Sequence, residues 1–248
     1  MKELNLNGLR PAIAEKIGPF FREIIAAHGE AIHSLHVSGS AVTPDFDEKT
    51  SDINSVIVLQ TMDLAFLEYL APLGKGYRKK RIAAPLVLDP DYIRSSLDVF
   101  PVEFHDLRLI HRTVYGDDIF QHLPIEDQYL RLQCEREVKT RLIRLRQGFV
   151  SSLDDRELLK DLLSRAVTGC FPLFRALITL MGGTPPVKRD EVLSTIGRMT
   201  SVGTDIFETL GRIRRKVISP SRDELHRLFH TFYGATGDLG KIIDGLAR

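Results

Sequence analysis

The chain has 248 residues, of which 43% are hydrophobic and 27% are charged, and its net charge is +1. These proportions are typical of a globular protein with a core. Its two cysteines, Cys134 and Cys170, lie in apolar helical patterns, which argues against a disulfide framework. The sequence has neither an N-terminal apolar signal nor an apolar run of about 18 residues, so we expect a cytoplasmic protein without a membrane span.

The first half of the chain alternates predicted helices and strands. Apolar residues recur at helical spacing in residues 11–28 and 63–73, with a short helical turn at 91–97. β-branched or alternating runs predict strands at residues 35–39, 53–60, 83–88, 99–107 and 113–116. This order is typical of a small mixed sheet covered by helices.

A basic run occupies residues 75–81, with the sequence KGYRKKR. It could face the phosphates of a nucleotide or nucleic acid. It could equally be a solvated turn between a helix and an edge strand. Both interpretations stay open at the level of sequence.

The second half changes character after Pro124 and is predicted to be all-helical. Apolar stripes predict a helix from about residue 130 to 149, a central helix over 158–178 kinked at Pro172, and helices near 188–199, 204–217 and from Pro220 onward. We therefore expect two domains: residues 1–124 with a mixed sheet, and residues 125–248 as a helical bundle, an α+β protein as a whole. The halves carry net charges of −4 and +5 when divided after residue 125, which permits a nucleic-acid partner without indicating one.

One stretch of the first half contains most of the candidate binding residues. The strand Leu35 to Ser38 ends at Gly39-Ser40, and after the eleven-residue loop 41–51 the chain continues as Asp52-Ile53-Asn54. Gly39 permits close approach of the backbone to a ligand. Asp52 and Asn54 stand two apart at the start of a strand, so their side chains share a face. Oxygen ligands beside a phosphate-sized turn are what a magnesium–nucleotide complex needs.

These residues resemble the signature of the DNA polymerase β-type nucleotidyltransferase superfamily: a strand ending in Gly-Ser, about a dozen residues, then an acid-hydrophobic-acid triplet. Val114-Tyr115-Gly116 resembles a further motif of the minimal and antibiotic-modifying members. The resemblance implies transfer of a nucleoside monophosphate from a nucleoside triphosphate to a hydroxyl acceptor, bound between the domains.

The resemblance also implies roles for individual residues. Gly39 and Ser40 would hold the triphosphate. Asp52, Asn54 and Glu103 would bind Mg²⁺, with the third carboxylate on a later, neighbouring strand, where Val102-Glu103-Phe104 fits. Glu103 would also accept a proton from the attacking hydroxyl.

Asn54 stands where the superfamily has a second acid, and this removes one negative charge from the metal site. Two interpretations follow: an active transferase in which the substrate phosphates supply the missing ligands, or a degenerate fold that binds a nucleotide or a protein partner in a regulatory role. Asp106 is a rival third carboxylate. His36 and His105 are candidate phosphate or metal ligands, or simply packed strand residues.

Overall fold

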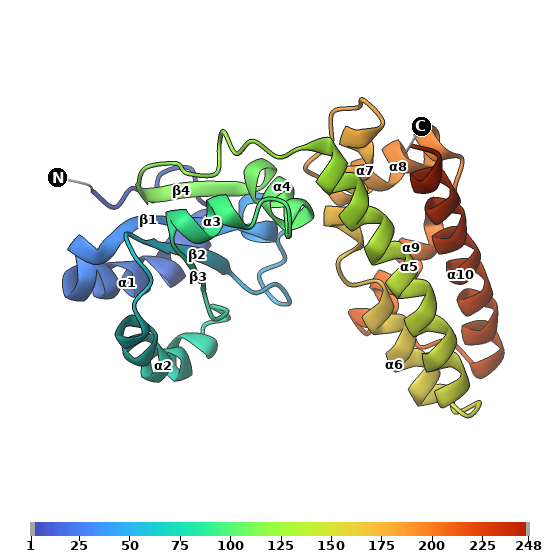
Figure 1. The fold of residues 1–248 in the computed structure, drawn as a ribbon. Coiled ribbons are helices and arrows are strands. Elements are labelled where there is room, and N and C mark those ends of the chain that lie inside the picture. The colour runs from blue at the N-terminus through green and yellow to red at the C-terminus, as the bar shows by residue number, and fades with distance from the viewer. Residues whose placement is uncertain (1–2, 247–248) are drawn as a thin grey trace. The chain divides into compact units, whose positions relative to one another are not determined.

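The computed structural model describes residues 3–246, and the chain divides into two compact units, one ending at Ile125 and one beginning at Glu126. Figure 1 shows the sheet in the first unit and a group of helices in the second. The α+β class predicted from the sequence is confirmed. Each unit is described in turn.

A four-stranded mixed sheet forms the first unit. Its strands are β1 (Ile32–Ser38), β2 (Asn54–Leu59), β3 (Leu86–Leu88) and β4 (His111–Gly116), in the order β3-β2-β1-β4. β1 runs antiparallel to both of its neighbours, whereas β2 and β3 are parallel and are joined through a helix. The turn that follows β1 therefore lies at the same end of the sheet as the start of β2.

Alternation along β1 gives the sheet two different faces. Leu35 and Val37 face α1 (Pro11–His28) and α2 (Leu64–Arg78) in the larger core. On the other face, α3 (Pro90–Ser95) and α4 (Pro101–Leu109) contribute Ile93 and Phe104 to a second core. His36 lies on this second face, in ring contact with Phe120.

The predicted strand over residues 99–107 is wrong, because this segment forms the helix α4. Its buried residues are Pro101, Val102, Phe104 and His105. That spacing is helical, and Pro101 occupies the first turn, where its missing N–H costs nothing. The segment is so short that its helical spacing also resembles the alternation of a strand.

Two helix boundaries also differ from expectation. α2 continues through Gly74, the predicted stop, to Arg78, so that much of the basic run is helical. The predicted helix over 158–178 is two helices, α6 (Arg156–Ala166) and α7 (Cys170–Leu180). The break falls at Gly169, whose φ of +74° a non-glycine residue rarely adopts, and Pro172 lies harmlessly in the first turn of α7.

The second unit is all-helical over its described residues. Besides α6 and α7 it contains α5 (Asp127–Ser151), α8 (Arg189–Thr200), α9 (Asp205–Arg214) and α10 (Arg222–Gly245). Phe174, Phe207 and Phe232 join α7, α9 and α10 through edge-to-face contacts with centroid distances of 4.8 and 5.4 Å. The predicted helical bundle is confirmed.

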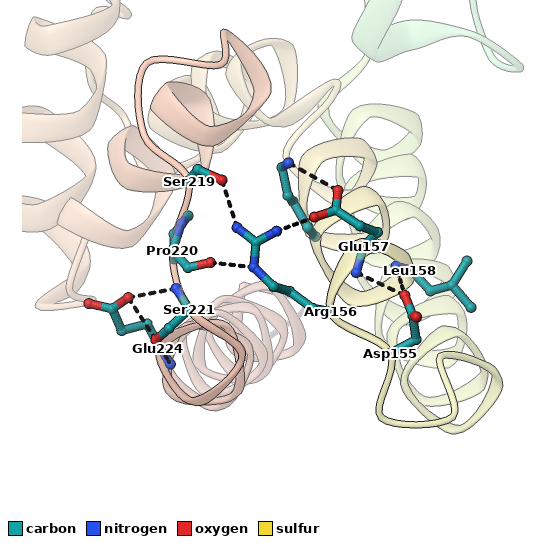
Figure 2. Close-up of polar contacts among 9 residues, drawn as sticks. Asp155, Arg156, Glu157, Leu158, Ser219, Pro220, Ser221 and Glu224 are labelled. Atoms are coloured by element: carbon teal, nitrogen blue, oxygen red, sulfur yellow. Dashed lines mark hydrogen bonds and ion pairs between the residues drawn. The ribbon is translucent and has the colours of Figure 1, made fainter.

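Polar contacts fix the start of α10 against α6 (Figure 2). Arg156 donates through Nε to the Pro220 carbonyl at 3.0 Å and through Nη2 to Ser219 Oγ at 2.6 Å. Ser221 and Glu224 form a reciprocal capping box at the first turn of α10. These bonds tie the loop before α10 to the first turn of α6.

Among the described residues, no single helix has the length and apolar character needed to cross a membrane. The bent pair α6 and α7 meets the criterion together, by length and composition only.

Candidate nucleotide-binding site

A tight turn follows β1 at residues Gly39–Val42. Gly39 has a φ of +66°, a conformation that favours glycine. Its N–H donates to the Ile110 carbonyl at 3.3 Å, and the Thr43 N–H closes the turn on the Ser40 carbonyl at 3.0 Å. The Gly39 N–H is therefore already hydrogen-bonded within the protein. The first N–H group of the turn that could donate to an anion is that of Ser40.

Asn54 lies directly against this turn. It pairs with Ser38 across β1 and β2, and a Cβ atom placed on Gly39 would lie 3.3 Å from Asn54 Nδ2. The Asn54 side chain is exposed, as is that of Asp52. The structure thus brings together the Gly39 turn and the start of β2, as the resemblance predicts.

Asp52 faces solvent beside a basic residue. Its side chain is 61% exposed, and Asp52 Oδ1 lies 3.5 Å from Arg81 Nη1, which also donates to the Thr50 carbonyl at 3.1 Å. An ion pair this exposed contributes little to stability, so Asp52 can exchange Arg81 for a cation at small cost.

Arg81 is the residue of the basic run 75–81 that lies beside Asp52, a pairing that the sequence analysis did not predict. It is brought there by the parallel bridge between Ile53 and Ile82 and by the bond from the Ile53 N–H to the Arg81 carbonyl. Only the pairing of β2 with the segment before β3 places Arg81 beside Asp52.

Three other residues of the basic run line an open concavity. Gly74, Lys75, Arg78 and Lys79 line a space of about 500 Å³ near the end of α2. Three cationic side chains at one concavity are compatible with an anion, and equally with a solvated helix end.

Glu103 does not lie where the resemblance requires it. It is an exposed residue in the first turn of α4, not a strand residue, and Asp106 lies on the same helix. The later strand that pairs with β2 is β3, and residues 82–88, IAAPLVL, contain no acid. Within residues 3–246, neither Asp52 nor Glu103 belongs to a group of three or more His, Cys, Asp or Glu side chains close enough to share one ion.

The two histidines that the sequence analysis considered are both buried, His36 on the second face of the sheet and His105 in the helix that packs there. His36 contacts the hydroxyls of Thr113 and Ser34 at 2.9 and 2.8 Å, and burial, with the nearby His111, lowers the pKa of His36 to about 3. His105 is buried in α4. Neither side chain lies at the surface beside Asp52.

Comparison with known proteins then decides the fold. No family model and no curated protein matches the sequence. Among solved structures, spectinomycin adenyltransferase AAD(9) from Enterococcus faecialis superposes with a TM-score of 0.54, covering 91% of this chain and 98% of that one, at 9% identity. The protein has a nucleotidyltransferase-like fold.

At this identity the likeness concerns the fold alone. The neighbour was determined with ATP and spectinomycin, a nucleotide and an antibiotic acceptor. In this nucleotidyltransferase-like protein the corresponding chemistry has to be argued from its own residues.

Proposed function

We propose that this protein binds a nucleoside triphosphate with Mg²⁺ at the turn after β1 and the start of β2, and that it has little or no transferase activity. The observation that carries the proposal is that Asn54 lies against the phosphate-sized turn at Gly39, with the exposed Asp52 two residues before it in the chain. The nucleotidyltransferase-like fold supports the same assignment.

The phosphates would be held by the turn. Without a side chain at Gly39 a phosphate can approach the backbone closely, and the Ser40 amide and hydroxyl are suitable donors. Arg81, released from Asp52 when a metal binds there, would add a positive charge toward the phosphates.

The donor set fits Mg²⁺ as a companion of the nucleotide. Asp52 offers an accessible carboxylate and Asn54 a neutral carbonyl oxygen, and Mg²⁺ commonly takes one or two protein carboxylates with the substrate phosphates supplying further oxygens. Mg²⁺ would neutralise phosphate charge and orient the triphosphate.

We favour nucleotide binding over nucleotidyl transfer because the site has too few carboxylates for two metal ions. A two-metal transfer centre clamps both the attacking and the leaving oxygens. Here Asn54 is neutral, the adjacent residues 82–88 hold no acid, and Glu103 stands on α4. One carboxylate at the strand end is enough for one metal–nucleotide complex, but not for the charge of two metals.

A second candidate function is transfer of a nucleoside monophosphate to a hydroxyl acceptor, with release of pyrophosphate. The named activity of the structural neighbour favours it. In this case Asp52 and the phosphates would hold the metal, and Glu103, reaching from α4, would accept the proton of the attacking hydroxyl.

Calorimetric titration tests the binding proposal. ATP, GTP, CTP and UTP are titrated with and without Mg²⁺ into the protein, into Asp52→Ala, and into Glu48→Ala, a control that removes an exposed acid from the same loop. We expect Mg²⁺-dependent binding of at least one nucleotide, lost in Asp52→Ala and kept in Glu48→Ala. Absence of binding by the unaltered protein would overturn the proposal and point to a protein partner.

Pyrophosphate release separates the two candidates. The nucleotide that binds is incubated with Mg²⁺ and a panel of hydroxyl-rich acceptors, including spectinomycin. The primary proposal expects no release above the level of Asp52→Ala. Acceptor-dependent release that is lost in both Asp52→Ala and Glu103→Gln would establish the transferase instead.

A further inference from the structure

We infer that His36, His111 and Asp118 form a binding site for a transition-metal ion of the Zn²⁺ class, on the sheet face opposite α1. One donor atom from each of the three side chains lies within 4.8 Å of the other two. This site is separate from the nucleotide site proposed at Asp52, and does not depend on it.

Three segments of the first unit bring the ligands together. His36 lies in the middle of β1, and His111 begins β4, where it pairs with Ser38. Asp118 follows in the loop after β4. The two histidine rings are edge-to-face with their centroids 5.6 Å apart. Pairing of β1 with β4 therefore fixes both imidazoles on one rigid face of the sheet.

The hydrogen-bond partners of His111 suit a metal ligand. Its Nδ1 lies 2.6 Å from the Leu107 carbonyl and its Nε2 lies 2.8 Å from Asp118 Oδ1. Both partners are acceptors, while a neutral imidazole has a single N–H. With Nδ1 donating to the Leu107 carbonyl, Nε2 presents its lone pair on the side of Asp118, as a metal ligand requires.

A hydrogen bond to the backbone orients His111 as a metal ligand. A histidine that ligates a metal usually donates its other N–H to a carbonyl or carboxylate, which fixes the ring and its tautomer, and the Leu107 carbonyl does this for His111. The third donor comes from β1.

That third donor, His36, is held in the form that metals bind. It is fully buried, and its contacts are the hydroxyls of Ser34 and Thr113, which can donate or accept. A neutral ring has one lone pair to offer a metal, and the hydroxyl that now faces that nitrogen would turn aside when the ion binds.

Asp118 is positioned by the backbone. The N–H groups of Phe120 and Gln121 each donate to its Oδ1 at 3.2 Å, and its side chain is 33% exposed. The carboxylate thus forms the solvent side of the cluster, and gives the ion a way in.

Two imidazoles and one carboxylate select the class of ion. Imidazole nitrogen suits Zn²⁺, Co²⁺, Ni²⁺ and Cu²⁺, whereas Mg²⁺ and Ca²⁺ prefer sites made of oxygen alone. Three protein ligands leave a fourth position for water, the arrangement common in open zinc sites.

Metal titration of the full-length protein, free of any histidine tag and stripped with EDTA, tests the site. Zn²⁺ is titrated by calorimetry, and Co²⁺ by its visible absorption, which reports the coordination. We expect one equivalent of each metal, a Co²⁺ spectrum of low coordination number, and a rise in the unfolding temperature with Zn²⁺.

Matched variants locate the ion. Asp118→Asn and His111→Gln should each weaken Zn²⁺ binding by at least about tenfold and abolish the rise in unfolding temperature. Asp117→Asn and His122→Gln, which alter the adjacent acid and a nearby exposed histidine, should leave both unchanged. Asp52→Ala should also keep the Zn²⁺ site.

Asp118→Asn is the decisive variant. Because Asp118 is partly exposed, we expect this variant to fold, and circular dichroism is used to check that it does. Failure of the unaltered protein to bind Zn²⁺ or Co²⁺ would overturn the inference and leave a hydrogen bond between His111 and Asp118. Binding that persists in folded Asp118→Asn and His111→Gln would overturn it as well.

Discussion

At the scale of single residues, the proposed chemistry depends on the side chain at position 54. Asn54 lies beside the Gly39 turn at the first residue of β2, and the exposed Asp52 comes two residues before it. A neutral amide there keeps the shape of an acid and removes its charge. The charge, more than the geometry, separates a metal–nucleotide binder from a transfer centre.

Restoring the acid should strengthen the metal site. We expect Asn54→Asp to tighten Mg²⁺-dependent nucleotide binding by about tenfold, because affinity for hard cations rises with the charge of the ligand set. Calorimetry at several Mg²⁺ concentrations measures the change, with Asn54→Ser as the neutral control. Equal affinity in Asn54→Asp and the unaltered protein would show that position 54 does not face the metal.

A side chain at Gly39 should harm the site more than the fold. Gly39 has a φ of +66°, and a Cβ atom would press on Asn54 Nδ2 at 3.3 Å. We expect Gly39→Ala to lower the free energy of unfolding by about 1 kcal/mol and to abolish nucleotide binding. Denaturant unfolding and calorimetry measure the two effects. Unchanged nucleotide affinity in the folded variant would contradict the placement of the phosphates at this turn.

The sequence predicts local site residues better than distant ones. The turn at Gly39 and the strand start at Asp52 are close in sequence, and their composition carries the signal. Arg81 reaches Asp52 only through a bridge between Ile53 and Ile82, which no local pattern shows. The His36, His111 and Asp118 cluster likewise depends on the pairing of β1 with β4.

At the scale of elements, short segments were the hardest to predict. Residues 99–107 can be read with a period of two or of three to four, and packing of Phe104 in the second core selects the helix. The same uncertainty led to Glu103 being placed on a strand. Longer elements with many apolar repeats, such as α1 and α10, were predicted within a few residues.

The end of β4 depends on a glycine that closes the sheet against β1. Gly116 has a φ of +75°, and a Cβ atom there would lie 2.1 Å from the His33 carbonyl oxygen. Since backbone must move, we expect Gly116→Ala to lower the free energy of unfolding by on the order of 2–4 kcal/mol.

Gly74 provides the matched control for this prediction. It lies inside α2, and a Cβ atom there would meet no atom within 4 Å. Gly74→Ala should therefore stabilise the protein by roughly 0.5–1 kcal/mol. Denaturant unfolding measures both variants, and a Gly116→Ala loss no larger than the experimental error would contradict the register of β1 and β4.

At the scale of the whole molecule, the chain contains two units with separate cores. The cores on the two faces of the sheet consist entirely of first-unit residues, while Phe174, Phe207 and Phe232 pack within the second. The sequence indicates this division by a change of pattern after Pro124, where mixed strand and helix patterns are replaced by helical apolar stripes alone.

Each unit should fold alone. We expect fragments 1–125 and 126–248 to unfold cooperatively in denaturant, because each buries its own apolar residues. Fragment 1–125 should keep Mg²⁺-dependent nucleotide binding, since Gly39, Ser40, Asp52 and Asn54 all belong to it. A fragment that unfolds without cooperativity would show that its core needs the other unit.

The most direct test of the central claim is hydrogen exchange of the full-length protein with and without a saturating Mg²⁺–nucleotide complex. A bound triphosphate should slow exchange of the backbone amides in peptides covering residues 40–43 and 52–55. Protection confined to other segments, or none despite measurable binding, would contradict a nucleotide site at the turn after β1.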